Sequence, residues 1–235
     1  MAHEHGEPLD IILFSEVMFD KNISGELPEH IDFVKNKCIP LFEKWGYRTE
    51  ILHSDKTYLD CFNHVIEKSE KNKGKIQGFP MPRMCKINDR CKTIPLDSYL
   101  RELKEEYTKY VGIAADEPKR LSRMGEKQIS LLYKYGFTED MARGLCEKYG
   151  LLSPTYEFTS RQGCWFCPNA KDKELKCLRK NHRELWDKLL ELEDRSNLLI
   201  DKWNAITKTR IHDKEEQFFW EEQQMTIFDY EELWR

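Results

Sequence analysis

The sequence has no run of about 18 apolar residues, and it does not start with the basic stretch and apolar segment of a secretory signal. Its first ten residues, MAHEHGEPLD, are polar and acidic. We therefore expect no membrane-spanning helix and a cytoplasmic location. Disulfides are rare in that reducing compartment. The eight cysteines are accordingly expected to be thiols, some of them metal ligands, and not a disulfide framework.

The chain also lacks a large excess of charge of either sign, because its net charge is only −4. Phosphate backbones are bound by clustered basic surface, so direct nucleic-acid binding has no support from the charge. No internal repeat is present either. The 235 residues, with 40% hydrophobic content, are enough to bury a core as one large domain or as a domain with a helical appendage.

The pattern of apolar residues predicts an α/β fold in which strands and helices alternate. Apolar runs bounded by turn residues indicate strands, and an apolar stripe of helical period indicates helices. Alternation of the two is typical of a parallel sheet covered by helices. The predicted strands are 10–17, 47–54 and 110–115. The predicted helices are 28–46, kinked or restarted at Pro40, then 57–71, 138–150 from an N-cap threonine to a glycine stop, and 182–203.

Cys164 and Cys167 lie in the stretch RQGCWFCPNA and form a C-x₂-C pair. A tight turn points both thiols of such a pair to one side, where they supply half of a tetrahedral metal site. Cys85 and Cys91, in RMCKINDRCKTIP, are close together in a loop-like context and complete a cage of four thiolates. Other interpretations remain open: the cysteines could be inert core residues, or Cys164 and Cys167 could be a redox pair.

The other four cysteines have different expectations. Cys38 and Cys61 lie on the apolar stripes of predicted helices, which favours a packing role. Cys146 and Cys177 are held in reserve as replacement ligands.

The segments ILFSEVMFD, RMCKINDRCKTIP, YVGIAADEPKR and GCWFCPNA, in this order, resemble the phosphoadenosine phosphosulfate (PAPS) reductase-like family of adenine-nucleotide α-hydrolase folds. The resemblance covers nearly all of residues 9 to 195. It implies a Rossmann-like parallel sheet and paired cysteines that hold zinc or an iron–sulfur cluster. It also implies that a strand end followed by arginine contributes to a substrate pocket. The residues that match this last pattern are Gly112, Ala114, Asp116, Glu117 and Arg120; their simpler interpretation is a solvated strand end.

The chain departs from the family at one important place, since it has no S-G-G-K-D-S phosphate loop. Such a loop aims several backbone N–H groups and a helix N-terminus at one anion. The glycine of ISGELPEH does not replace it, because Glu26 and Glu29 would repel a phosphate. We therefore expect a truncated Rossmann-like sheet over residues 1–160, lacking the first strand and its loop. A metal-stapled cysteine region and a helical extension follow over residues 161–235, and any substrate pocket is vestigial.

These features predict a non-catalytic, metal-stabilised binding or inhibitor protein, encoded by a phage or another mobile element. Its expected partner is a protein, such as a host nucleic-acid enzyme of the CRISPR nuclease type. Zinc is the expected metal because a chain without the nucleotide loop has little use for an electron carrier, and an iron–sulfur cluster is the alternative. Four cysteines serve both kinds of site.

Two further functional hypotheses stay open. The first is a PAPS reductase-like enzyme or sulfurtransferase whose phosphate loop lies in another chain or upstream of this one. The second is a thiol redox protein. The tail from Asp213 is acidic and rich in aromatic residues, which suits a basic partner; alternatively it folds back on its own core. His3 and His5 are expected to be disordered.

Overall fold

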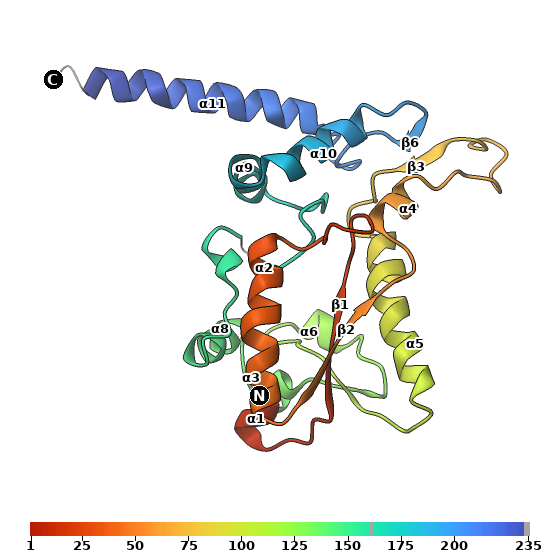
Figure 1. The fold of residues 1–235 in the computed structure, drawn as a ribbon, viewed down its shortest axis with the longest axis vertical. Helices are drawn as coiled ribbons and strands as arrows, with labels where there is room; N and C mark the ends of the chain where they lie inside the picture. The colour runs from red at the N-terminus through yellow and green to blue at the C-terminus, as the bar shows by residue number, and fades with distance from the viewer. Residues whose placement is uncertain (160–161, 233–235) are drawn as a thin grey trace.

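The structure is a computed structural model that describes residues 1–159 and 162–232, with side chains described up to residue 224. It is a mixed α/β protein with short parallel strands (Figure 1). The predicted boundary between residues 160 and 161 falls on residues outside the described part. In the described part, no helix combines the length and the apolar character needed to cross a membrane.

The centre of the N-terminal half is a pair of parallel strands, β1 (Ile11–Glu16) and β2 (Arg48–His53), both predicted from the sequence. Their register runs from Ile11 opposite Arg48 to Glu16 opposite His53. A long helical segment joins the two strands and lies on one side of them, while α5 (Ile94–Glu102) lies on the other (Figure 1). The carboxyl ends of both strands therefore point the same way, toward the cysteine segments.

The joining segment is one continuous helix in three parts: α2 (Pro28–Phe33), a π-helical turn η1 (Val34–Cys38) and α3 (Ile39–Lys44). Pro40 cannot donate a backbone hydrogen bond, and the wider π turn directly before it accommodates that loss. Gly46, with a φ of 88°, ends the segment in a conformation that side chains disfavour. The predicted restart and stop are both confirmed.

The remaining strands differ from the prediction of a single sheet. Among the described residues, β3 (Ile76–Gly78) pairs with β6 (Leu198–Ile200), and β4 (Lys109–Tyr110) pairs with β5 (Gln128–Ile129), each pair forming its own two-stranded parallel sheet. The predicted third strand, 110–115, was wrong in its extent. The N–H of Ile113 donates to the carbonyl of Val111, so the backbone turns on itself where the strand was expected to continue.

Local signals at the helix ends were predicted correctly, but two helices are shorter than predicted. The predicted helix 182–203 ends at Glu193, and residues 198–200 form strand β6 instead. The predicted helix 57–71 is shorter still. Thr57 forms a capping box with Asp60 at the start of α4 (Tyr58–Phe62), and Thr138 caps α8 (Glu139–Lys148). α4 ends after five residues because the following segment extends and Val65 pairs with Ile76 in an antiparallel bridge.

The other helical elements are short or belong to the C-terminal half. They are α1 (Ala2–His5), η2 (Asn88–Thr93), α6 (Pro118–Leu121), α7 (Leu131–Lys134), η3 (Pro154–Glu157), α9 (Asp172–Asn181), α10 (Arg183–Glu193) and α11 (Ile211–Glu232).

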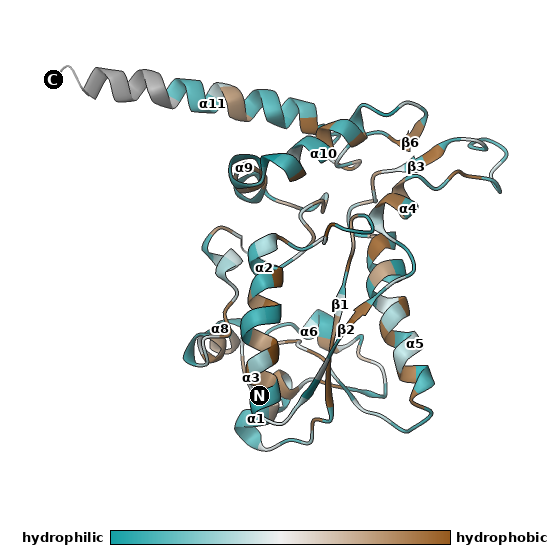
Figure 2. Cartoon of the chain, viewed as in Figure 1, coloured by the Kyte–Doolittle hydropathy of each residue, from teal (hydrophilic) through white to brown (hydrophobic). Residues whose placement is uncertain are grey.

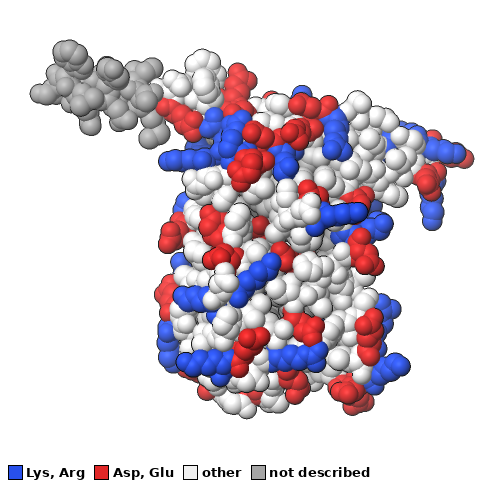
Figure 3. Space-filling model, in the orientation of Figure 1, with Lys and Arg blue, Asp and Glu red and all other residues white. Residues whose placement is uncertain are grey.

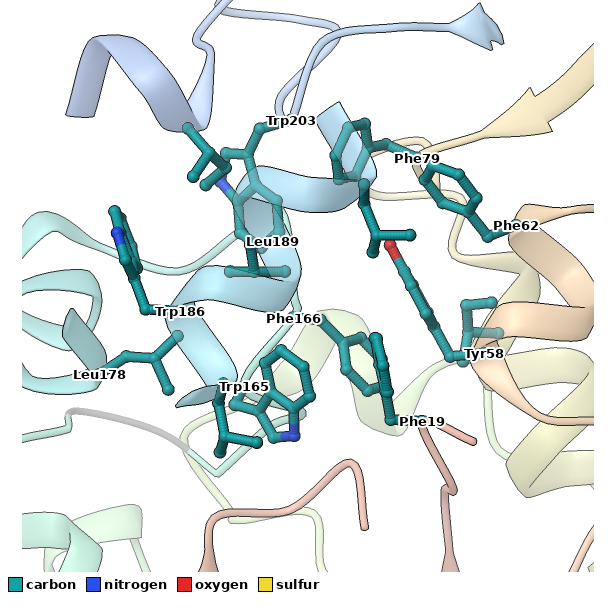
Figure 4. Close-up of a cluster of buried hydrophobic side chains, with 14 of the residues drawn as sticks. Phe19, Tyr58, Phe62, Phe79, Trp165, Phe166, Leu178, Trp186, Leu189 and Trp203 are labelled. Atoms are coloured by element: carbon teal, nitrogen blue, oxygen red, sulfur yellow. The ribbon is translucent and has the colours of Figure 1, made fainter. Parts of the chain in front are cut away.

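One aromatic-rich cluster joins the two halves of the chain (Figure 4). As predicted, α10 buries Leu185, Trp186, Leu189 and Leu192. They share the cluster with residues that are far away in sequence: Phe19, Tyr58, Phe62, Phe79, Trp165, Phe166 and Trp203. In Figure 2, apolar positions (brown) and polar positions (teal) alternate along α5 and along the α2–α3 segment.

The N-terminal residues are docked and not disordered, which corrects the expectation for His3 and His5. His3 stacks on Trp45 with 4.1 Å between ring centroids, and His5 stacks on Tyr135 at 3.7 Å. Ion pairs from Glu4 to Lys148 and from Glu7 to Lys134 fasten the same segment. Aromatic neighbours and paired acids thus hold a terminus whose sequence alone looks unstructured.

Candidate metal centre

The C-x₂-C loop is fixed against the turn that follows β1. The backbone N–H of Trp165 donates to the carbonyl of Gly25 at 2.9 Å, and its indole Nε1 donates to the carbonyl of Ser24 at 2.8 Å. The N–H of Cys167 donates to the carbonyl of Cys164 at 3.0 Å, which closes the tight turn predicted for the pair. Both thiols are thus carried by a loop with little freedom.

The Cys85–Cys91 segment is held at the carboxyl ends of the central strands. Ser15 Oγ, at the end of β1, donates to the carbonyl of Cys91 at 3.2 Å. Ser54, one residue past β2, donates to the carbonyl of Arg90 at 2.9 Å. The thiol of Cys91 donates to the carbonyl of Lys56 at 3.2 Å. The fold therefore brings the second predicted cysteine pair to the edge where α/β proteins place their sites.

Cys85, Cys91 and Cys164 lie at the aromatic cluster that contains Tyr58. This tyrosine is fully buried and lies against Phe166 with 4.1 Å between ring centroids (Figure 4). Its pKa is raised well above the usual value, first by burial and then by the nearby thiols, those of Cys85, Cys164, Cys167 and Cys61. Cys91 adjoins Cys61, since each of these two thiols shifts the pKa of the other.

The sulfur atoms have different electrostatic surroundings. Burial raises the pKa of Cys164, the carboxylate of Glu26 raises it further, and the ammonium of Lys92 opposes both. Lys92 also binds Glu26, with 3.2 Å between Nζ and Oε1. The pKa of Cys85 is raised by burial, while hydrogen bonds from the backbone amides of Asn88 and Ile87 lower it.

Cys61 and Cys91 form a coupled pair at the edge of this centre. The pKa of Cys91 is raised, first by its hydrogen bond with Cys61 and then by burial, whereas the same bond lowers the pKa of Cys61 to about 7. Cys61 is buried, as expected for a packing residue. Sequence reasoning missed its contact with Cys91, because nothing in a helix stripe shows which loop packs against it.

The donor set suits a thiophilic ion. Four thiols from two separate segments, amide N–H groups directed at one sulfur and a lysine nearby are features of thiolate metal sites. Among the described residues, however, no group of three or more His, Cys, Asp or Glu side chains is placed so that it could hold an ion as it stands. The hydroxyl of Tyr58 is buried in the same region without a hydrogen-bond partner.

The two reserve cysteines lie elsewhere. Cys146 on α8 lies near Cys38. The pKa of Cys38 is raised to about 11, mainly by burial and to a smaller extent by the charge of Cys146. Cys177 on α9 accepts a hydrogen bond from Asn181 at 3.2 Å. Neither is among the thiols that raise the pKa of Tyr58.

The residues of the predicted vestigial pocket are engaged in local contacts. Glu117 accepts the backbone N–H of Ala114 at 3.1 Å and pairs with Arg120 at 2.7 Å. Asp116 accepts the N–H of Glu139 at 3.2 Å, at the start of α8. The space around Gly112 is open. The fold thus keeps these five residues together within 112–120, and neighbouring donors engage both acids.

Sequence reasoning also missed an acid–histidine pair at the ends of the central strands. Glu16 is 3% exposed and its Oε2 lies 3.0 Å from His53 Nε2 and 3.8 Å from Lys35 Nζ. The two residues face each other in the strand register. The sequence contains a hint of this pair, because SEV and LHS lie at the ends of two consecutive predicted strands. Placing Glu16 opposite His53, however, requires the register of the two strands.

The backbone amides of the turn ISGELPEH form hydrogen bonds within the protein. The N–H of Gly25 donates to the carbonyl of Val17 at 2.6 Å, and the N–H of Glu26 donates to Ser24 Oγ at 3.2 Å. Glu26 itself is buried. These donors are therefore committed to the protein and are not directed at an external anion.

No protein-family model, no curated protein and no solved structure matches this chain.

Proposed function

We propose that this chain is a non-catalytic binding protein stabilised by a metal ion held by Cys85, Cys91, Cys164 and Cys167. The observation that supports the proposal is that Cys85, Cys164 and Cys167 are near Tyr58, and that Cys91 is near Cys164 and Cys85. To ligate one ion, the thiol side chains turn toward one another within this region. Zinc is the proposed ion and an iron–sulfur cluster the alternative.

The ion would tie two parts of the chain together. The Cys85–Cys91 segment is held by β1 and β2, whereas Cys164 and Cys167 precede α9 and the helical C-terminal region. A four-thiolate zinc site carries excess negative charge, which the ammonium of Lys92 is close enough to offset. Such a site contributes to folding directly, since an unfolded chain does not present the four thiols together.

Metal analysis of the purified chain tests this proposal. We expect about one zinc per chain in a colourless protein, whereas absorbance near 400 nm would identify a cluster. Cys164→Ser and Cys91→Ser should each lose the metal and lower the melting temperature, and a chelator should do the same to the wild type. Cys177→Ser is the matched control and should keep the metal. A metal-free wild-type protein with an unchanged melting temperature would contradict the proposal.

The proposed binding surface lies on α11. Ile211 and Phe218 are buried against the body, whereas Phe219 and Trp220 are 45% and 57% exposed, and the helix projects beyond the body (Figure 1). The base of the tail therefore packs on the body, while two aromatic side chains of the same helix are left exposed. Exposed aromatic residues beside acids suit a partner with a basic surface.

Charges on the face shown in Figure 3 are intermixed, with acidic and basic side chains adjacent over α9 to α11. This arrangement favours a protein partner over a nucleic-acid backbone, which requires an extended basic surface. A host nucleic-acid enzyme such as a CRISPR nuclease remains the predicted class. With such a nuclease purified, Phe219→Ala combined with Trp220→Ala should abolish binding without changing the melting temperature. Equal binding by that variant would remove α11 from the interface.

One observation favours the enzymatic alternative, a PAPS reductase-like enzyme on a truncated Rossmann-like sheet. Glu16, His53 and Lys35 gather at the carboxyl ends of β1 and β2, where open α/β sheets bind their ligands. Hydrolysis of ATP or tight binding of a sulfonucleotide by the purified chain would support this alternative and overturn the non-catalytic proposal.

A further inference from the structure

A cavity lies beside the cysteine centre, between α4, β3 and β6. Its volume is about 420 Å³, which is within the range of small-molecule sites. Tyr58 and Cys61 belong to its wall, and Lys86, Ile87 and Arg90 of the Cys85–Cys91 segment line it too, so the cavity adjoins the centre. The rest of its lining comes from residues 62–84 and from β6, which hold no proposed ligand.

The inner wall of this cavity is apolar and largely buried. Phe62 and Ile87 are 1% and 4% exposed, and Met81, Ile66 and Ile200 add aliphatic and thioether surface. Tyr58 contributes the one buried hydroxyl there, and this hydroxyl has no hydrogen-bond partner. A buried polar group without a partner is costly, and a bound molecule that hydrogen-bonds to it would remove that cost.

The rim of the cavity is cationic. Lys68, Lys86 and Arg90 line it, against the single carboxylate of Glu67. Within the described part of the chain, none of the three cations forms an ion pair with a carboxylate. Three cations against one carboxylate give the rim a local surplus of positive charge, in a chain whose net charge is −4.

From these observations we infer that the cavity binds a small amphipathic anion, meaning an apolar body that carries one carboxylate or sulfonate group. The apolar body fills the space among Phe62, Ile87 and Met81, and the anionic group lies at the rim between Lys86 and Arg90. An apolar wall with a few convergent polar groups is the usual composition of such sites. This inference concerns a separate ligand and does not depend on the metal or on the α11 interface.

The probe for a test is 8-anilinonaphthalene-1-sulfonate, whose fluorescence rises in apolar surroundings. Its uncharged relative N-phenyl-1-naphthylamine has the same aromatic body without the sulfonate. We expect the sulfonate to bind the wild-type protein about ten-fold more tightly than the neutral probe, since each charge-assisted contact is worth roughly that factor. Equal affinity of the two probes would overturn the inference.

Two sets of variants locate the binding. Lys86→Gln combined with Arg90→Gln should weaken the sulfonate about ten-fold or more and leave the neutral probe unchanged. Lys44→Gln, at an exposed lysine that does not line the cavity, should change neither. Met84 lines the cavity and is 71% exposed, so Met84→Glu should fold normally and weaken the sulfonate, whereas Met84→Leu should not. Unchanged sulfonate binding in the double variant, or the same loss in Lys44→Gln, would overturn the inference.

Discussion

Gly25 is the residue at which the N-terminal strand pair and the C-x₂-C loop come closest. A Cβ at this position would lie 2.7 Å from the carbonyl oxygen of Val17 and 2.9 Å from Cζ of Phe166. Both are sub-van-der-Waals contacts, and one of the two atoms belongs to the backbone. The absence of a side chain at residue 25 is therefore what lets Trp165 and Phe166 pack onto the turn after β1.

Gly25→Ala is predicted to lower the free energy of unfolding by about 1 to 3 kcal/mol, the usual cost of overpacking a filled site. Gly112→Ala is the matched control, because the space around Gly112 is open and neither glycine has a positive φ. That variant should stay within about 0.5 kcal/mol of the wild type. Urea unfolding followed by fluorescence measures both. Equal stability of the two variants would show that the loop contact is not tight.

At the scale of elements, α11 is fastened to the body through Glu215. This carboxylate binds Arg179 at 2.9 Å and Arg183 at 3.0 Å, and accepts the indole N–H of Trp186. Burial raises the pKa of Glu215, but these three hydrogen-bonding partners outweigh it and hold the pKa below the usual 4.5. Three side chains from α9 and α10 thus converge on one acid at the base of the projecting helix.

Because the pKa of Glu215 is lower in the folded chain than in the unfolded one, its contribution to stability is present above the unfolded value and is lost as pH falls through the folded value. The melting temperature of the wild type should therefore exceed that of Glu215→Gln by a constant amount from about pH 7 to about pH 5. This difference in melting temperature should shrink below about pH 4.5. Glu191→Gln, at an exposed acid of α10, should show no such difference. A difference for Glu215→Gln that does not depend on pH would contradict the ionic origin of the contact.

Elements were predictable from sequence wherever the signal was local. Capping by Thr57 and Thr138, the break at Pro40 and the stop at Gly46 depend on a few neighbouring residues, and all are present in the structure. The strand 110–115 and the long helix after Thr57 failed for the opposite reason. Their extent is decided by hydrogen-bond partners far along the chain, such as Ile129 and Ile76, and an apolar run does not identify its partner.

The candidate site shows the same division. The C-x₂-C pair and the pair Cys85 and Cys91 can be recognised from their spacing in the sequence. The fold brings these cysteines to one region. Tyr58, Cys61 and the pair Glu16 and His53 were missed because only the packing of α4 and the register of β1 on β2 bring them there.

At the scale of the whole molecule, the core is shared between the first and last thirds of the chain. Tyr58, Phe62 and Phe79 pack with Leu189 and Trp203, and β3 pairs with β6. A fragment of residues 1–160 is therefore predicted not to fold alone, since it exposes half of the cluster and leaves Ile76 and Gly78 without strand partners. Circular dichroism and limited proteolysis of the fragment, beside the full chain, measure this. A protease-resistant fragment with cooperative melting would show that residues 1–160 are an independent domain.

The pairing of β3 with β6 also has a consequence for synthesis on the ribosome. Residues 76–78 leave the exit tunnel while more than a hundred residues are still to be translated, so their partner strand does not yet exist. At translation rates of about 5–20 residues per second, the edge of β3 stays unpaired for several seconds or longer. The nascent polypeptide is thus a natural client for a holdase chaperone until its last segment emerges.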